Sequence, residues 1–142
     1  MTRSLIITGG AGFIGANFVY HWANRHPEDH IVVLDALTYA GNRTSLTPLE
    51  ESGRIQFVAG DICDASLVAK VMADHSVDTI VHFAAESHVD RSITGPDAFI
   101  RTNIEGTHTL LAAARQAWLA GSGCDHRFHH VSTDKVYGSL DG

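Results

Sequence analysis

Residues 8–15 read Thr8-Gly9-Gly10-Ala11-Gly12-Phe13-Ile14-Gly15 and directly follow the apolar run Leu5-Ile6-Ile7. The apolar run predicts a strand, and the glycines predict a tight turn that opens an amphipathic helix. Backbone N–H groups at the start of a helix are unpaired and carry partial positive charge, so they bind phosphate groups. Glycine suits this turn because a Cβ would block the close approach of a pyrophosphate. With a strand before it and a helix after it, the pattern predicts a dinucleotide-binding turn.

A second apolar run, Ile31-Val32-Val33-Leu34, ends in Asp35, twenty positions after Gly15. In dinucleotide sites, an acidic residue at the end of the second strand holds the 2′-hydroxyl of the adenosine ribose. A carboxylate accepts hydrogen bonds from a diol but repels a 2′-phosphate, which favours NAD over NADP. The alternative is a solvated acid at a strand end. The preceding glycine turn makes the cofactor role the preferred interpretation.

The composition is that of an ordinary globular chain of 142 residues, about one domain in length, with 44% hydrophobic residues. Ten lysines and arginines stand against sixteen aspartates and glutamates, and no basic cluster occurs, which argues against a nucleic-acid partner. No apolar run has the length of a membrane span, and the N-terminus does not read as a signal peptide. Cys63 and Cys124 are far apart and are expected to be reduced thiols of a cytoplasmic protein.

Strand-like and helix-like patterns alternate along the chain. The spacing of Ile14, Phe18 and Trp22 places apolar side chains on one face of a helix, and Asp64 is the expected N-cap of a later helix. The predicted strands are 4–8, 31–34, 55–59, 79–83 and 128–132. The predicted helices are 13–25, a short one at 46–52, 65–75 and a long one at 96–120, with a polar loop over 84–95.

This alternation predicts an α/β fold, a Rossmann-type doubly wound parallel sheet with right-handed crossovers. The expected strand order is 3-2-1-4-5, and a ligand would lie across the carboxyl ends at the switch between the first and fourth strands. Because the chain stops ten residues after Ser132, residues 1–142 are expected to form a partial NAD-binding domain, truncated before the end of the fold and without the substrate domain. One flank of the sheet would then be uncovered.

Four further segments carry a family resemblance. They are Leu37-Thr38-Tyr39-Ala40-Gly41-Asn42, the stretch 61–64 (DICD), the stretch 83–92 (FAAESHVDRS) and the stretch 128–134 (FHHVSTD). Together with the glycine turn, they make the chain similar to the extended short-chain dehydrogenase/reductases, and within these to the dTDP-glucose 4,6-dehydratases. The resemblance covers essentially all 142 residues. The glycine turn is shared by the whole superfamily, whereas 37–42 and 86–92 are much more specific.

The resemblance implies a lyase of nucleotide-sugar metabolism that holds NAD tightly and uses a nucleotide-sugar substrate such as dTDP-glucose. In that reaction the sugar C4 hydroxyl is oxidised by hydride transfer to NAD, water is eliminated across C5 and C6, and the hydride returns to C6. Oxidation at C4 is chemically useful because a ketone acidifies the neighbouring C5 proton. The resemblance also implies that the full-length enzyme is a homodimer, formed through the long helix 96–120 together with a helix that this chain lacks.

The resemblance assigns roles to matching positions. Ser87 and Thr133 would contact the substrate, Thr133 as part of the catalytic group. Asp134 would be the general acid that protonates the departing C6 hydroxyl, a step that a poor leaving group requires. The implied cofactor-binding residues are Gly9, Gly12, Phe13, Ile14, Gly15, Asp35, Thr38, Asp61, Ile62, Phe83, Ala84, Ala85, Glu86 and Thr102.

One departure from the family pattern is Lys135, which stands after Asp134 where these relatives have a glutamate base. A lysine has a reference pKa of ~10.4, and lowering it by about three units costs roughly 4 kcal/mol, which needs a desolvated or cationic site. Some other nucleotide-sugar 4,6-dehydratases resemble this chain in having Asp-Lys here, so Lys135 is one candidate base for the C5 proton. In the other interpretation Lys135 faces solvent and elimination is impaired.

A second departure concerns the Tyr-x-x-x-Lys pair that takes the C4 hydroxyl proton in this superfamily. Tyr20, Tyr39 and Tyr137 have no lysine four positions later, so the pair would lie beyond Gly142. The 142-residue chain alone is therefore expected not to turn over substrate. Two alternatives remain: a UDP-sugar 4-epimerase or decarboxylase of the same superfamily, and a non-catalytic NAD-binding module.

The ten histidines do not predict a metal site. His126, His129 and His130 lie close in sequence, but neighbouring strand residues point to opposite faces of a sheet. His82 and His88 flank the expected cofactor loop, and packing roles are preferred for both.

Overall fold

The structure, a computed structural model, describes residues 2–119 and 125–138 and contains one five-stranded parallel sheet. The strands are β1 (Ser4–Thr8), β2 (His30–Asp35), β3 (Gln56–Ala59), β4 (Thr79–His82) and β5 (Arg127–His130). Their order is β3-β2-β1-β4-β5. All neighbouring pairs are parallel, with Leu5 of β1 opposite Ile31 and Thr79. The predicted fold class and strand order are confirmed.

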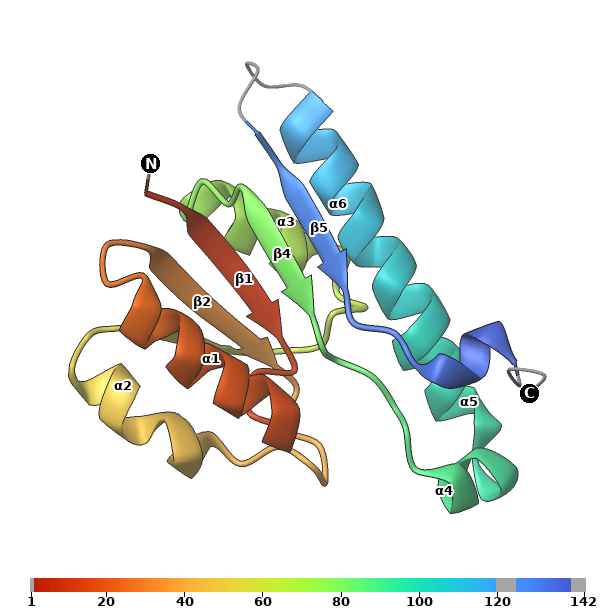
Figure 1. Cartoon of the computed structure of the whole chain (residues 1–142). Coiled ribbons are helices and arrows are strands. Elements are labelled where there is room, and N and C mark those ends of the chain that lie inside the picture. The colour runs from red at the N-terminus through yellow and green to blue at the C-terminus, as the bar shows by residue number, and fades with distance from the viewer. Residues whose placement is uncertain (1, 120–124, 139–142) are drawn as a thin grey trace.

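Helices cover both faces of this sheet (Figure 1). On one face lie α1 (Phe13–Arg25), a short 3₁₀ turn (Arg43–Leu46) and α2 (Thr47–Glu51), and on the other lie α3 (Ala65–Asp74) and α6 (Thr107–Leu119). The remaining elements are α4 (Val89–Thr94), α5 (Pro96–Phe99), a π-helical segment (Ile100–Gly106) and a 3₁₀ turn (Asp134–Tyr137). The predicted helix 13–25 and the N-cap Asp64, whose carboxylate accepts the N–H of Leu67 at 3.0 Å, are confirmed.

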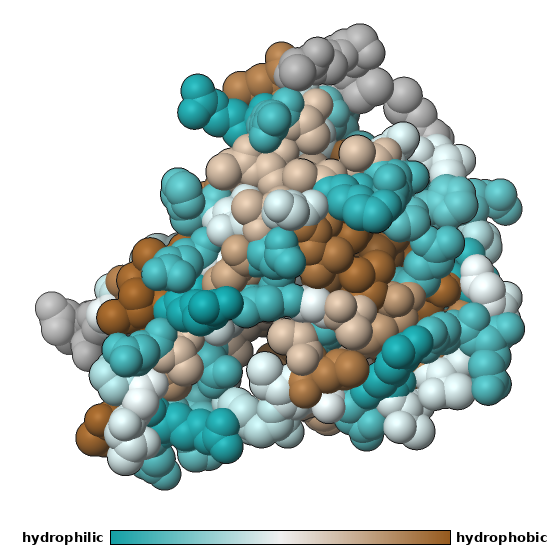
Figure 2. Space-filling view, turned by 180° about the vertical axis from the view of Figure 1, so that it is seen from behind, coloured by the Kyte–Doolittle hydropathy of each residue, from teal (hydrophilic) through white to brown (hydrophobic). Residues whose placement is uncertain are grey.

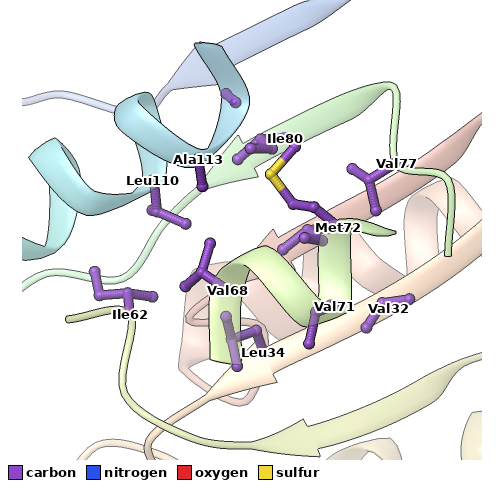
Figure 3. Close-up of a cluster of buried hydrophobic side chains, with 12 residues drawn as sticks. Val32, Leu34, Ile62, Val68, Val71, Met72, Val77, Ile80, Leu110 and Ala113 are labelled. Carbon is purple, nitrogen blue, oxygen red and sulfur yellow. The ribbon is translucent and has the colours of Figure 1, made fainter. Parts of the chain in front are cut away.

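Alternation along the strands divides the core into two clusters. Leu5 and Ile7 of β1 pack on the α1 side, whereas Ile6 packs on the α3 side. Figure 3 shows the second cluster, in which Val68 and Met72 of α3 face Leu110 of α6. The central strands β1, β2 and β4 are apolar on both faces because helices remove both faces from water, whereas β3 and β5 at the edges are partly exposed. The site therefore stands on the buried centre of the sheet.

Two predicted elements differ from the structure. The expected loop over 84–95 contains the helix α4, and the expected long helix over 96–120 is divided into α5, the π-helical segment and α6. Asn103, inside the π-helical segment, makes two hydrogen bonds to the backbone of Glu86. Residue 120, the predicted helix end, lies outside the described residues. A π-helical segment has about one extra residue per turn compared with an α-helix. The hydrophobic periodicity of the sequence does not show where such a segment forms, because tertiary contacts determine its place.

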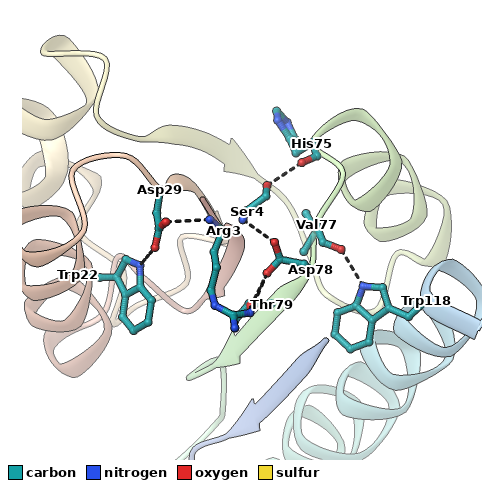
Figure 4. Close-up of polar contacts among 9 residues, drawn as sticks. All are labelled: Arg3, Ser4, Trp22, Asp29, His75, Val77, Asp78, Thr79 and Trp118. Carbon is teal, nitrogen blue, oxygen red and sulfur yellow. Dashed lines mark hydrogen bonds and ion pairs between the residues drawn. The ribbon is translucent and has the colours of Figure 1, made fainter. Parts of the chain in front are cut away.

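Two carboxylates, one buried and one partly exposed, join the amino ends of the strands (Figure 4). Asp29 accepts hydrogen bonds from the Arg3 N–H at 2.8 Å and from the Trp22 indole at 3.0 Å. Asp78 accepts the Ser4 N–H at 2.9 Å. These bonds satisfy backbone donors that have no strand partner, so they stabilise the sheet rather than bind a ligand.

Asp78→Ala is expected to lower the free energy of unfolding by about 1–3 kcal/mol, because the half-buried Ser4 N–H loses its acceptor. Urea unfolding of the chain measures this loss. Asp74→Ala is the matched control, since the Asp74 carboxylate pairs with exposed Lys70 on the same helix and such pairs contribute about 0.5 kcal/mol. Equal losses in the two variants would contradict the assignment of a structural role to Asp78.

Candidate functional site

An open cleft with a cavity volume of about 150 Å³ lies at the carboxyl ends of the central strands. It sits where the chain leaves β1 toward β2 on one side and meets β4 on the other, the position at which doubly wound sheets bind ligands. Its walls are Gly9, Gly12, Leu34, Asp35, Ala36, Thr38, Ala40, Gly41, Gly60, Asp61, Ile62, Phe83, Ala84, Ala85, Glu86 and Thr102. Eleven of the predicted cofactor residues are thus brought together by the fold.

The glycine turn forms the floor of this cleft. Gly9 has φ +67°, a left-handed conformation, and a Cβ there would lie 2.7 Å from the backbone nitrogen of Ala84. A Cβ on Gly15 would lie 2.2 Å from the carbonyl oxygen of Gly9. The turn can therefore pass this close to β4 and to its own helix only with glycine at both positions. Gly12 caps α1 and offers no side-chain hydrogen bond to the first N–H groups of the helix.

Phe13 and Ile14 do not line the cleft, and their side chains are largely exposed at the start of α1. Within the described residues nothing accepts a hydrogen bond from their backbone N–H groups. The start of α1 is therefore an unsatisfied group of donors beside the glycine turn, as an anion site requires.

Asp35 is buried at the end of β2 and is already partly occupied. Its Oδ2 accepts the N–H of Ala11 at 2.9 Å, and its Oδ1 accepts the N–H of Leu37 at 2.8 Å. The carboxylate thus links the glycine turn to the loop after β2, a role that sequence reasoning missed. Each carboxylate oxygen has a second lone pair, so acceptor capacity toward the cleft remains.

Asp61, Ile62 and Thr102 form the wall beyond β3. Burial raises the pKa of Asp61, but hydrogen bonds from the Cys63 N–H at 2.8 Å and the Arg101 guanidinium at 3.0 Å outweigh it and hold the pKa below its usual value. The Asp61 carboxylate therefore stays ionised. Its bonds fix the loop that carries Ile62 against the cleft.

The opposite wall is the segment Phe83–Glu86, which continues from β4. Asn103 accepts the Glu86 N–H at 2.8 Å and donates to the Glu86 carbonyl at 2.9 Å, so one side chain holds both backbone groups of that residue. Sequence reasoning did not single out Asn103, and nothing local in the sequence marks this contact.

His82, the last residue of β4, is 1% exposed and bonded at both ring nitrogens. Nδ1 lies 2.6 Å from the hydroxyl of Thr8, and Nε2 lies 2.9 Å from that of Thr107. Burial, with a smaller contribution from the charge of His130, lowers the pKa of His82 from 6.5 to about 4. The packing role expected for His82 agrees with this geometry, which ties β1 to α6 behind the cleft.

The low pKa of His82 makes stability depend on pH. In the unfolded chain His82 is protonated below about pH 6.5, whereas in the folded chain it stays neutral until about pH 4. The contribution of neutral His82 to the free energy of unfolding is therefore fully present above pH 6.5 and is lost as the pH falls from 6.5 to 4. The slope approaches 1.4 kcal/mol per pH unit. Urea unfolding at several pH values should give a flatter profile for His82→Gln, and parallel profiles for the two proteins would contradict this assignment.

Ser87, Thr133 and Asp134 do not line the cleft, and all three are exposed. The Thr133 hydroxyl donates to Asp134 Oδ1 at 3.1 Å, at the carboxyl end of β5. The side chain of Lys135 lies outside the described residues, as does Cys124, whereas Cys63 is a free thiol. The structure thus gathers the predicted cofactor residues more completely than the predicted catalytic ones.

Two observations concern other classes of site. Across residues 2–119 and 125–138, no group of three or more His, Cys, Asp or Glu side chains is placed to hold a metal ion. In the same part of the chain, none of the helices has the length and apolar character needed to cross a membrane.

Comparison with known proteins gives the family. The sequence profile described as GDP-mannose 4,6 dehydratase matches residues 6–142. The chain belongs to that family. It is also homologous to the dTDP-glucose 4,6-dehydratases, with 54% identity over 139 residues to dTDP-glucose 4,6-dehydratase 1 of Escherichia coli K12 and 50% over 137 residues to the Mycobacterium tuberculosis enzyme. These alignments cover 96% of this chain but 38% of each relative, so the chain spans about two fifths of their length.

Solved structures agree with this assignment. DesIV, a dTDP-glucose 4,6-dehydratase from Streptomyces venezuelae crystallised with NAD, superposes with a TM-score of 0.86 at 51% identity, covering 99% of this chain and 42% of that one. A UDP-glucose-4-epimerase from Stenotrophomonas maltophila with bound NAD has a TM-score of 0.83 at 27% identity, covering 99% and 40%. The fold is shared by both enzymes, and the sequence stands much nearer to the dehydratase.

Proposed function

We propose that this chain is the NAD-binding portion of a dTDP-glucose 4,6-dehydratase. The observation that carries the proposal is the cleft in which the glycine turn, the free start of α1 and the Asp35 carboxylate converge. Homology at about 50% identity to dTDP-glucose 4,6-dehydratases supports the reaction class. The relatives crystallised with NAD support the choice of cofactor.

The residues present fit NAD. The unpaired N–H groups of Phe13 and Ile14 would bind its pyrophosphate, where Gly9 and Gly12 leave no Cβ in the way. Asp35 would use its free lone pairs on the ribose hydroxyls. The outer walls complete the site: Thr38, Asp61, Ile62 and Thr102 would border the adenosine half, and Phe83, Ala84, Ala85 and Glu86 the nicotinamide half.

Bound NAD would supply the hydride acceptor for the sugar C4 position and the hydride donor for C6. Asp134 would hold a proton for the departing C6 hydroxyl, with Thr133, its hydrogen-bond partner, orienting it. Ser87 would contact the sugar nucleotide. Lys135 has the two interpretations given above: it removes the C5 proton, or it faces solvent.

The homodimer proposal rests on the helix face between α5 and α6. Ile100, Ile104 and Leu111 follow one another at helical spacing and are 48% or more exposed. Figure 2, seen from the side of α3 and α6, shows apolar side chains among polar ones toward the edge where these helices lie. Exposed apolar stripes of this kind mark association surfaces. Analytical ultracentrifugation of the chain and of its Ile104→Glu variant would test the proposal. The variant is expected to sediment as a monomer.

Calorimetric titration of the 142-residue chain tests the cofactor. NAD is expected to bind, and NADP is expected to bind at least about tenfold more weakly, because its 2′-phosphate would meet the Asp35 carboxylate. Asp35→Asn should reduce the difference in affinity between NAD and NADP. Circular dichroism of the folded chain serves as the control, and absence of NAD uptake by folded chain would remove the proposed function.

A chimaera tests the reaction. Residues 1–142 would replace the matching segment of the Escherichia coli relative, which supplies the remaining length. With dTDP-glucose, the product is expected to be the 4-keto-6-deoxy sugar nucleotide, identified by mass spectrometry as the loss of one water. A product with unchanged mass and inverted C4 would instead favour the epimerase alternative.

A further inference from the structure

Two loops that approach each other at the edge of the cleft make a contact that the proposed chemistry does not use. One is the loop 36–42 after β2, and the other is the segment 86–88 together with the first turn of α4, which carries Arg91. The Arg91 guanidinium lies over the ring of Tyr39, 3.8 Å from its centroid. The Glu86 carboxylate lies near enough to the Tyr39 hydroxyl to raise the pKa of that hydroxyl. Tyr39, Glu86 and Arg91 together are called the strap below.

The chemistry of these three groups makes the contact cohesive. Burial, followed by the neighbouring Glu86 carboxylate, raises the pKa of Tyr39, so its hydroxyl stays protonated. A guanidinium over the face of an aromatic ring is attracted by the ring quadrupole. Arg91 also carries the charge opposite to that of Glu86. The Arg91 guanidinium is thus attracted both to the Tyr39 ring on the other loop and to the negative charge of Glu86.

The position of Tyr39 connects this contact with the cleft. Its chain neighbours Thr38 and Ala40 both line the cleft, while Glu86 lines it from the other side. The base of the loop is fixed at both ends: Leu37 by its N–H to Asp35, and Asn42 by its N–H to the Ala11 carbonyl at 2.9 Å. The tip that carries Tyr39 can therefore separate from Arg91 without disturbing the glycine turn.

The far side of the strap is equally anchored. The backbone of Glu86 is held by Asn103 through both its N–H and its carbonyl. Tyr39 is 49% exposed, so the strap lies at the mouth of the cleft rather than in its floor. The loop 36–42 and the segment around Glu86 are thus both anchored at their bases, and the Arg91–Tyr39 contact between them can open or close the mouth of the cleft.

We propose that Tyr39 and Arg91 are positioning residues that close the mouth of the dinucleotide cleft and set the rate at which the bound cofactor leaves. This inference rests on the proposed function, because the occupant is NAD. A reaction that regenerates its cofactor in each cycle gains from slow release. The strap supplies that retention without touching the reacting atoms.

Stopped-flow displacement of NADH by excess NAD measures the release rate directly. Arg91→Ala and Tyr39→Ala should each release NADH about three to ten times faster than the unchanged chain, the range expected for a half-exposed cation–π contact. Tyr39→Phe keeps the ring under Arg91 and loses only the hydroxyl near Glu86, so its effect should be smaller. Arg91→Lys should partly restore slow release. Arg25→Ala, which removes an exposed arginine at the far end of α1, is the charge-matched control.

Amide hydrogen exchange without cofactor gives a second readout. Residues 37–42 should exchange faster in Arg91→Ala than in Arg25→Ala, while β1 exchanges equally in both. NAD binding with release rates and exchange unchanged across the strap variants would overturn the strap and leave the proposed function standing. Absence of NAD binding in the unchanged chain would overturn the proposed function itself and the strap's role with it.

Discussion

Gly9→Ala is expected to abolish detectable NAD binding and to lower the free energy of unfolding by about 2–5 kcal/mol. Part of this loss comes from the left-handed backbone at φ +67°, which a Cβ disfavours by about 1 kcal/mol or more. The larger part comes from crowding, because the new Cβ would lie 2.7 Å from the backbone nitrogen of Ala84, which cannot rotate away as a side chain can. Urea unfolding and calorimetric titration measure the two effects.

Gly53→Ala separates the effect of the left-handed backbone conformation from the effect of crowding by the new Cβ. Gly53 has φ +72°, nearly the same as Gly9, but a Cβ there meets nothing within 4 Å. This variant should lose about 1 kcal/mol from backbone strain alone and should bind NAD as the unchanged chain does. If Gly9→Ala cost no more than Gly53→Ala, the close approach between the glycine turn and β4 would not be what demands glycine.

Asp134→Asn, introduced into the active chimaera, is expected to lower kcat for water elimination by a factor of about 10² or more. A positioned general acid contributes roughly 10²–10⁴-fold, and asparagine keeps the shape of the side chain but has no acidic proton for the departing hydroxyl. NAD affinity should be unchanged, because Asp134 lies outside the cleft lining. Product formation and NAD titration, measured on the same sample, distinguish a loss of catalysis from a loss of cofactor binding.

Asp97→Asn is the control for this variant, since Asp97 lies exposed in the first turn of α5. It removes the same charge and should leave kcat within about twofold. Full activity in Asp134→Asn would exclude Asp134 as the proton donor. A loss of NAD affinity equal to the loss of kcat would instead assign Asp134 to cofactor binding.

Much of the architecture could be predicted from local sequence. The bounds of β1 and α1, the N-cap Asp64 and the strand order agree with the structure, because each depends on a pattern within a few residues or on the handedness of crossovers. The division of 84–120 into α4, α5, a π-helical segment and α6 could not be read in this way. Its shape depends on Asn103 reaching back to Glu86, which no periodicity encodes.

For the site, the glycine turn, Asp35 and the family resemblance predicted most of the positions that line the cleft, but not how they are held. Eleven predicted residues meet there, whereas Asp35 also proved to bind the N–H groups of Ala11 and Leu37. The roles of Ser87, Thr133, Asp134 and Lys135 stay predictions that the variants above can test.

The sequence alone determined that a strand, a glycine turn and a helix would follow one another and that the second strand would end at Asp35, since those features depend on neighbouring residues. Only the tertiary structure decided that His82 would be locked between Thr8 and Thr107, and that Arg91 would cover Tyr39. These partners lie 25 to 74 positions apart, so their contacts exist only after packing has brought separate strands and loops together.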